Sequence, residues 1–199
     1  RIINNATGFH PKRTMPLLHK TTLRKWYNKN QKSGFRSQKP ETFNKKVYLF
    51  CDEFTHYNDV EAGQKLILLL EKLGYNVIIP EHLESGRTYL SKGLVKEAQK
   101  IALKNIDLLK DIIKGETPII GIEPSAILTL RDEYPDLVSG NQKLAAKEIA
   151  KNTFLFDEWF AEEISKGNIR ASSFTTEKKI IQVHGHCHQK ALSSVQHTV

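Results

Sequence analysis

The sequence predicts a Rossmann-like three-layer α/β domain with a mainly parallel sheet. Short apolar runs of strand length alternate with longer segments whose apolar residues recur at helical spacing, and glycine or proline ends most of them. A strand, a helix and a second strand in succession form a β-α-β unit, which places the two strands parallel. We therefore expect strands near 46–51, 75–79, 117–122 and 179–184.

Helices are expected between these strands. Gly74 and Gly115 follow two long amphipathic segments and are typical helix ends. Pro124 stands at the first turn of a third segment, where its missing N–H does no harm. The expected helices are 60–73, 90–113, 124–132 and 141–167, the last with a break near Thr153.

The composition indicates a globular protein of ordinary make-up. The 199 residues are 39% hydrophobic and 26% charged, and no apolar run approaches the roughly 18 residues of a transmembrane helix. Cys51 and Cys187 cannot form a disulfide scaffold, which favours a reducing compartment and a cytoplasmic location, with peripheral attachment at the inner face of the membrane left open. Because the chain begins at Arg1 without a signal peptide pattern, we expect a piece of a longer protein.

The N-terminal segment is strongly basic. Residues 1–46 contain twelve lysines and arginines and a single acid, Glu41, within a chain of net charge +8. Such a segment can bind nucleic acid or an anionic membrane surface, but its aromatic residues are not spaced like a base-stacking platform. We interpret 1–45 as a basic connector and 46–199 as the α/β domain, truncated at its C-terminal side, with no nucleic-acid partner.

A stretch rich in metal-binding residues follows the last expected strand. His184, His186, Cys187 and His188 can bind a metal or carry a proton. Ligands collect at the carboxyl ends of strands in open α/β sheets, and imidazole and thiolate suit zinc or iron. A solvated loop is the alternative.

Two strand ends have similar patterns. Residues 47–53 align with 181–187, which places Glu53 opposite Cys187. The match lies in hydrophobic pattern more than in identity. It indicates an internal duplication, with 46–199 as the first copy and part of the second.

Four motifs in order resemble a known family. They are LFCDEFTHY at 49–57, ESGR at 84–87, GIEPS at 121–125 and HGHCHQKAL at 184–192. Together they resemble the cysteine-rich "CCG" domain of FAD-linked oxidases of the D-lactate dehydrogenase and glycolate oxidase type. More distantly, the chain is similar to the cysteine-rich subunit of heterodisulfide reductase and to the iron–sulfur subunit of anaerobic glycerol-3-phosphate dehydrogenase. The resemblance covers about 46–192.

The resemblance implies a larger protein that oxidises a 2-hydroxy acid with FAD and passes electrons through 4Fe-4S centres. The partners of this chain would then be the upstream flavin and ferredoxin-like domains of the same protein. FAD and 4Fe-4S are expected in that parent protein and not in this fragment, which has no flavin-binding segment and no cluster-binding set of cysteines.

This chain departs from the family at its cluster positions. The relatives use one cysteine after the first strand, a Cys-Cys-Gly and a Cys-Pro-x-Cys, twice over; none of these cysteines is present in the first copy here, and the second copy keeps only Cys187. The corresponding positions in this chain are Glu53, Glu84, Ser85, Glu123 and Ala126. Without thiolates a cluster has no normal anchorage, so no cluster is expected at this site.

The glutamates suggest a different ligand. Carboxylates with neighbouring imidazoles suit a single divalent ion such as Zn, Mn or Fe(II). Alternatively, the site has decayed and the acids cap helices. Arg87 is expected to form an ion pair with one of these glutamates. The candidate metal ligands are Glu53, Glu84, Glu123, His186, Cys187 and His188.

Three functional classes follow. The first is an accessory electron-transfer or docking domain of an oxidoreductase, with no catalytic residue assigned in this fragment. The second is a non-catalytic structural or metal-binding interaction module, which could act as a homodimer. The third, a mononuclear metal hydrolase, would use His186 or His188 as the base beside a metal-bound water.

Overall fold

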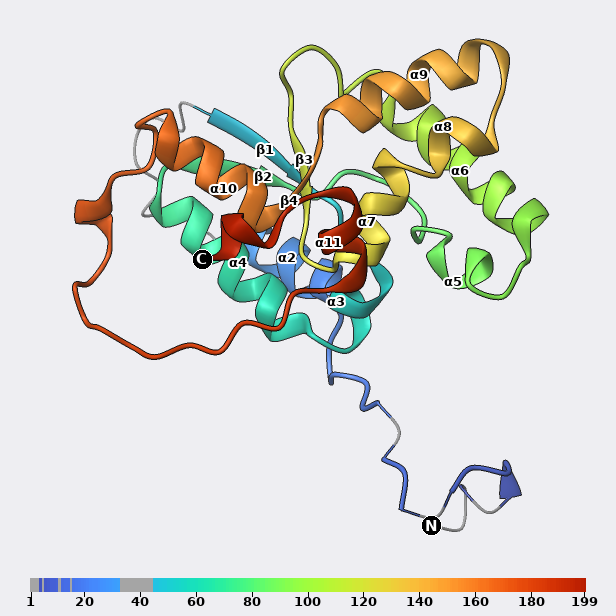
Figure 1. Cartoon of the computed structure of the whole chain (residues 1–199), viewed down its shortest axis with the longest axis horizontal. Helices are drawn as coiled ribbons and strands as arrows, with labels where there is room; N and C mark the ends of the chain where they lie inside the picture. Colours follow the sequence, from blue (N-terminus) through green and yellow to red (C-terminus); the bar gives the residue numbers. More distant parts are fainter. Residues whose placement is uncertain (1–3, 5, 11, 15, 33–44) are drawn as a thin grey trace.

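The computed structural model describes residues 4, 6–10, 12–14, 16–32 and 45–199 (Figure 1). Among these residues no helix is long and apolar enough to cross a membrane. The strands are β1 (Lys45–Leu49), β2 (Tyr75–Ile78), β3 (Ile119–Gly121) and β4 (Thr153–Leu155). The longer helices are α2 (Leu23–Lys32), α4 (Val60–Lys72), α6 (Val95–Leu109), α7 (Pro124–Arg131), α9 (Gly140–Lys151) and α10 (Phe156–Ser165). The short helices are α3 (Glu53–Tyr57), α5 (Arg87–Leu90), α8 (Tyr134–Leu137), η1 (Ala171–Ser173), α11 (Cys187–Leu192) and η2 (Val195–Thr198).

The four strands form one parallel sheet in the order β2-β1-β3-β4. The register pairs Val47 with Val77 on one side of β1, and Tyr48 with Ile119 on the other. The chain adds β2 on one side of β1 and then β3 on the opposite side, so the strand order reverses between β1 and β3. In open α/β sheets such a switch point is where ligands bind.

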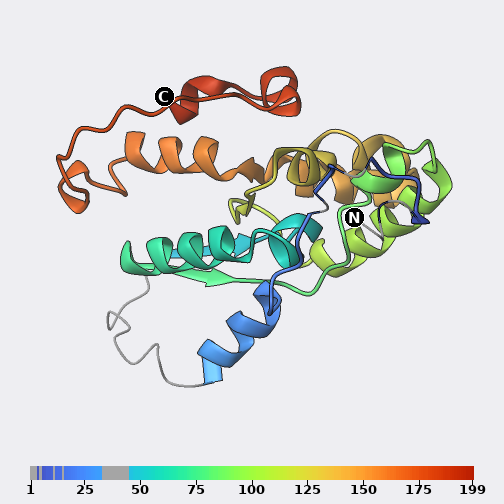
Figure 2. The same cartoon turned by 90° about the horizontal axis from the view of Figure 1, so that it is seen from below.

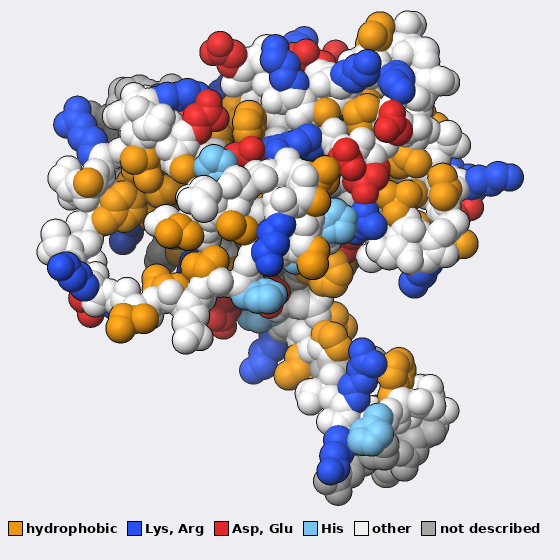
Figure 3. Space-filling view, viewed as in Figure 1, with side chains coloured by type: hydrophobic (Ala, Val, Ile, Leu, Met, Phe, Trp, Pro, Cys, Tyr) orange, Lys and Arg blue, Asp and Glu red, His pale blue; other side chains and the backbone are white. Residues whose placement is uncertain are grey.

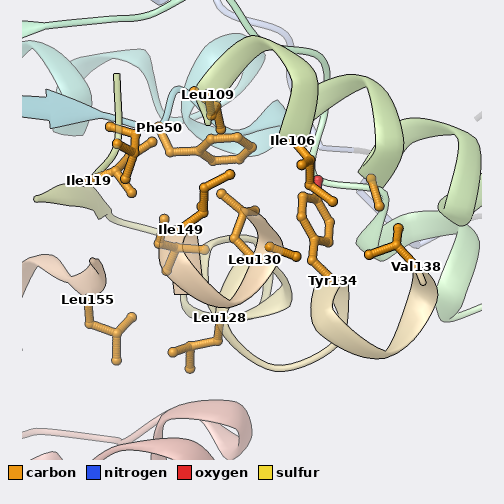
Figure 4. Close-up of a cluster of buried hydrophobic side chains, with 14 residues drawn as sticks. Phe50, Ile106, Leu109, Ile119, Leu128, Leu130, Tyr134, Val138, Ile149 and Leu155 are labelled. Carbon is orange, nitrogen blue, oxygen red and sulfur yellow. The ribbon is translucent and has the colours of Figure 1, made fainter. Parts of the chain in front are cut away.

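Helices cover both faces of this sheet, which gives the expected three layers (Figure 2). One core joins Phe50 and Ile119 to apolar residues of α6, α7 and α9, and Figure 4 shows Tyr134 and Leu130 packed within it. The second core joins Val47, Leu49 and Val77 to α2, α4 and α10. The strands are therefore apolar on both sides, as parallel strands buried between helices require.

The fourth strand is not the one expected from the sequence. Residues 179–184 form no strand, and Ile180 is fully exposed in an extended segment outside the sheet. The fourth strand is β4, within the region expected to be a broken helix. Its break at Thr153 is a three-residue strand between α9 and α10. An apolar run indicates a strand only when a neighbouring strand is available to pair with it.

Side chains close the outer edge of β4. The Ile119 amide donates to the Asn152 carbonyl, which therefore faces β3. Because backbone groups alternate in direction along a strand, the Thr153 carbonyl and the Leu155 amide face away from β3. Arg131 Nε and Nη2 donate to the Thr153 carbonyl at 2.9 and 2.6 Å, and the Leu155 amide donates to Glu158 Oε2 at 3.3 Å. Arg131 and Glu158 also form an ion pair at 2.5 Å. The pair takes the hydrogen-bonding place of a further strand.

The helix of the basic segment lies on the domain itself. Leu23 of α2 is fully buried in the second core, Tyr27 Oη donates to the Val77 carbonyl at 2.9 Å, and Arg24 Nη1 donates to the Pro80 carbonyl at 2.9 Å. The expected connector, 1–45, falls partly outside the described residues. Its boundary with the domain stays a prediction.

Candidate functional site

The candidate glutamates follow the carboxyl ends of three strands. Glu53 comes after β1, Glu84 lies in the loop after β2, and Glu123 follows β3. We call these three residues the glutamate edge. Since the carboxyl ends of parallel strands meet at one edge of a sheet, the fold brings the three loops together at the switch point between β1 and β3.

Glu53 joins the loops that follow β1 and β2. Its Oε1 accepts a hydrogen bond from Ser85 Oγ at 2.7 Å, and its Oε2 accepts from the Ser85 amide at 3.1 Å. Ser85 is fully buried, so the Glu53 carboxylate satisfies polar groups that water cannot reach. Both are positions at which the family resemblance implied cysteine, and here they bind each other.

Buried polar side chains hold the loop that contains Glu84. Asn105, fully buried on α6, accepts from the Leu83 amide at 2.7 Å and donates to the Glu84 carbonyl at 2.9 Å. The side-chain Nδ2 of Asn105 also donates to Tyr134 Oη at 2.7 Å, and Tyr134 Oη donates to the Ser85 carbonyl at 3.0 Å. Two buried side chains therefore fix the backbone of this loop.

Gly86 completes the same loop. Its φ is +80°, a left-handed conformation that favours glycine, and it begins α5. The Glu84 side chain lies above this turn. Partial burial raises the pKa of Glu84, the charge of Glu53 adds to the rise, and hydrogen bonds with Thr88 and Tyr89 oppose it.

Glu123 caps α7, as the decayed-site alternative expects. Its Oε2 accepts from the Ala126 amide at 2.6 Å, and both of its carboxylate oxygens lie within 2.9 Å of Ser125 Oγ. His186 Nε2 lies 3.9 Å from Glu123 Oε1, so the histidine reaches the glutamate edge at this residue.

A buried aspartate lies beside the glutamates. Asp52 is 1% exposed and caps α3, where its Oδ1 accepts from the amides of Phe54 and Thr55. Burial raises the pKa of Asp52 to about 6, and the charges of Glu53 and Glu123 contribute to this rise.

The histidine segment, residues 184–188, belongs to a C-terminal stretch that passes over the outside of the domain (Figure 2). It leads into α11, which packs against α7, while η2 at the end of the stretch packs against α10. Gln189 anchors it: this side chain is 7% exposed, and its Nε2 donates to Asp157 Oδ2 at 2.7 Å and to Thr198 Oγ1 at 3.1 Å. Gly185 is also required, because a Cβ there would lie 2.2 Å from Val195 Cγ1. Histidine and acidic side chains are interspersed on this face (Figure 3).

Within the histidine segment only His186 approaches a glutamate. His186 Nδ1 accepts from the His188 amide at 3.2 Å, which places the ring proton of neutral His186 on Nε2, the atom that faces Glu123. The rings of His186 and His188 are 5.7 Å apart, while Cys187 and His184 are exposed.

The structure thus brings the predicted residues together in pairs. Glu53 approaches Ser85 and Glu84, and Glu123 approaches His186, but the described part of the chain contains no group of three such side chains that could hold a metal ion. Arg87 does not pair with the glutamate edge as expected. Its Nη1 forms an ion pair with Glu133 at the start of α8, since the α5 turn directs it toward that helix.

A second polar group behind the glutamate edge was not identified from the sequence. His82 Nε2 accepts from the Cys51 amide at 3.0 Å, and its Nδ1 is 2.6 Å from the Leu83 carbonyl. The His56 ring nitrogen Nδ1 lies 3.3 Å from Cys51 Sγ. Burial raises the pKa of Cys51 to about 12 and lowers that of His82 to about 3. The thiol is therefore protonated and the His82 ring is neutral.

The sequence could have signalled part of this architecture. Asn105 interrupts the apolar face of α6 between Ala102 and Leu109, and a polar residue at a core position of a helix needs a buried partner. Nothing in the local pattern shows that the partner is Tyr134, which is 29 residues away.

Comparison with known proteins relates the chain to dehydrogenases. It is 26% identical over 164 residues to D-2-hydroxyglutarate dehydrogenase of Pantoea ananatis, and 26% identical over 180 residues to the enzyme of that name from Escherichia coli. These matches cover 80% and 87% of this chain, but 16% of each relative. One subunit of the anaerobic glycerol-3-phosphate dehydrogenase of Escherichia coli is 26% identical over 160 residues, which cover 71% of this chain and 38% of that subunit.

No family model matches the chain, and no solved structure matches it. The chain spans 16% of the length of the two D-2-hydroxyglutarate dehydrogenases and 38% of the glycerol-3-phosphate dehydrogenase subunit. It is therefore an α/β unit related to a part of larger dehydrogenases.

Proposed function

We propose that this chain is the CCG-type domain of a FAD-linked, iron–sulfur oxidoreductase that oxidises a 2-hydroxy acid of the D-lactate or glycolate type. The domain has an accessory role, in which it mediates electron exit or docks the neighbouring flavin and ferredoxin-like domains. The similarity to parts of named dehydrogenases supports the redox context. Because the relatives extend far beyond the matched region, flavin and substrate sites belong in other domains.

The observation that carries the accessory role is the bond between Glu53 and Ser85. Iron–sulfur clusters are held by thiolates. At the five positions where the resembled family has cysteines, this chain has carboxylate, hydroxyl and methyl groups, and Glu53 and Glu123 bind the amides of Ser85 and Ala126. Of the two thiols, Cys51 is buried and Cys187 lies on the C-terminal stretch. The residues at this site do not fit a cluster.

Anaerobic reconstitution with iron and sulfide tests this proposal. We expect the purified chain to stay without absorption near roughly 400 nm, where iron–sulfide charge transfer is seen. A variant with cysteine at the five positions should gain this absorption, since Asn105 and Tyr134, which are not replaced, still hold the backbone of the Glu84 loop. The replaced residues are Glu53, Glu84, Ser85, Glu123 and Ala126.

The wild-type sample can overturn the proposal that this site holds no cluster. Stable cluster absorption in the wild-type chain that is retained after Cys187→Ser would contradict it, because Cys51 would then be holding a cluster beside the glutamate edge. Circular dichroism should first establish that the five-cysteine variant is folded.

The accessory role has a separate test in the longer protein. Deletion of 46–199 should leave reduction of the flavin by a 2-hydroxy acid in a single turnover intact, and should slow steady-state transfer of electrons to an external acceptor. Loss of flavin reduction in a deletion variant that retains its flavin would place the domain in the substrate reaction and contradict the accessory role.

A further inference from the structure

A large pocket lies at the end of the sheet opposite to the glutamate edge. Its volume is about 680 Å³, within the range of about 300–1,000 Å³ that is usual for small-molecule sites. Residues at the start of all four strands line it: Lys45 and Lys46 begin β1, Tyr75 begins β2, Pro118 precedes β3 and Asn152 precedes β4. In Figure 1 this region lies where β1 starts, near the C-terminal end of α10.

We call this pocket, at the amino ends of the strands, the amino-edge pocket. The buried carboxylate of Glu163 forms its floor and is held by hydrogen bonds. Glu163 of α10 is 7% exposed, and its Oε2 accepts from Tyr75 Oη at 2.5 Å and from Asn168 Nδ2 at 2.9 Å. Lys45 Nζ lies 3.6 Å from the same oxygen. The Trp159 ring meets the Tyr75 ring edge to face, with centroids 5.1 Å apart, so an apolar wall stands beside the polar floor.

Of the four lysines that line the pocket, two are paired with acids and two have no acidic partner in the described part of the chain. Lys166 pairs with Glu162 at 2.8 Å and is also influenced by Glu116, and Lys45 is neutralised by Glu163. Two further lysines, Lys46 and Lys151, line the same pocket and form no ion pair with any residue that the structure describes. Two unpaired ammonium groups at the mouth of one pocket attract an anion.

We infer that the amino-edge pocket binds a small organic anion, in which a carboxylate or phosphate meets Lys46 and Lys151 and an apolar or planar body lies against Phe154 and the Tyr75–Trp159 wall. Lys45 is not part of the anion contact, because its charge is already engaged by Glu163. This site goes beyond the proposed accessory function. It is separate from the glutamate edge, so either can fail without the other.

Trp159 provides a direct readout of binding. In a Trp26→Phe background, Trp159 is the remaining tryptophan and lines the pocket. The probes are phenyl phosphate, benzoate and inorganic phosphate, at matched ionic strength. We expect phenyl phosphate or benzoate to change the fluorescence saturably, and inorganic phosphate to bind at least about tenfold more weakly because it lacks the apolar body.

Charge-matched variants decide whether the two lysines make the site. Lys46→Gln with Lys151→Gln should weaken binding by about tenfold or more. The control, Lys96→Gln with Lys147→Gln, removes the same charge from exposed helix positions and should leave binding unchanged. Equal weakening in both double variants would show non-specific charge attraction. That result, or no saturable signal with either organic probe below about 10 mM, would overturn the inference.

Discussion

The glutamate edge and the histidine segment were expected to form one site, yet the protein holds them in different ways. Glu53 accepts from the amide of the fully buried Ser85 in the next loop, and Glu123 accepts from the Ala126 amide of the helix that it caps. The histidine segment lies at the surface, leads into α11, which packs on α7, and is anchored through Gln189. A residue directly after a core strand is held in place by the packing of the sheet. A surface segment with the same kinds of ligand groups is held only by its own few side-chain contacts.

Loss of the buried support should have the largest effect on the glutamate edge. Asn105→Ala leaves the Leu83 amide, the Glu84 carbonyl and Tyr134 Oη without their partner in the protein interior. We expect unfolding free energy to fall by about 3 kcal/mol in urea denaturation. Lys104→Ala, an exposed position on the same helix, is the control. A loss below about 1 kcal/mol would mean that the loop is supported elsewhere.

Low pH should lower the unfolding free energy of the protein through protonation of His82. Burial lowers the pKa of His82 from 6.5 to about 3, so its stabilising contribution is complete above pH 6.5 and is lost as the pH falls toward 3. Protonated Nε2 could no longer accept from the Cys51 amide. Between about pH 7 and pH 4.5, wild type should lose on the order of 2 kcal/mol more unfolding free energy than His82→Gln.

An exposed histidine provides the control for this measurement. His197→Gln should keep the wild-type pH dependence, because His197 lies on the surface. If His82→Gln and wild type showed the same dependence on pH, a neutral buried His82 would be excluded.

Removing the link between the first two loops should have an intermediate effect. Glu53→Ala leaves the amide and the hydroxyl proton of the buried Ser85 without their acceptor, and we expect a loss of about 1.5 kcal/mol in unfolding free energy. Glu61→Ala, an exposed acid at the start of α4, should cost less than about 0.5 kcal/mol. Equal effects of the two substitutions would show that Ser85 finds water when Glu53 is removed.

The histidine segment should respond locally and not globally. Gln189→Ala removes the bonds to Asp157 and Thr198 and should speed tryptic cleavage at Lys178 and Lys179 several-fold, while unfolding free energy changes by less than about 0.5 kcal/mol. Gln196→Ala, at an exposed position, should cleave like wild type. A large global loss would instead make the C-terminal stretch part of the core.

The smallest effect is expected from metal removal. Because the described residues bring no three candidate ligands together, Glu84→Ala should shift Tm equally with and without a chelator. A larger shift in the presence of Zn²⁺ or Mn²⁺ than after chelation would support the divalent-ion hypothesis, since an ion that binds the folded state stabilises it by mass action.

Parts of the fold and of the candidate site could be predicted from the sequence, and other parts could not. Helix α4 and the start of α7 were predictable, because apolar spacing and Pro124 are local signals. The meeting of Glu53, Glu84 and Glu123 at one edge follows from parallel topology alone. The pairing of Arg87 with Glu133 was not predictable, since the two residues are 46 positions apart and meet only in the folded chain. The run at Ile180 and Ile181 has the composition of a buried strand, but burial depends on a partner that composition does not specify.

The Arg131–Glu158 pair at the edge of β4 has a consequence for behaviour in a concentrated solution. An uncovered edge strand is a template on which other chains can add strands and aggregate. Here a guanidinium and a carboxylate occupy the Thr153 carbonyl and the Leu155 amide. Arg131→Ala would uncover the Thr153 carbonyl and remove the partner of Glu158, and its first symptom would be turbidity that depends on protein concentration. In this domain an ion pair has the protective role that a covering strand or helix has in other proteins.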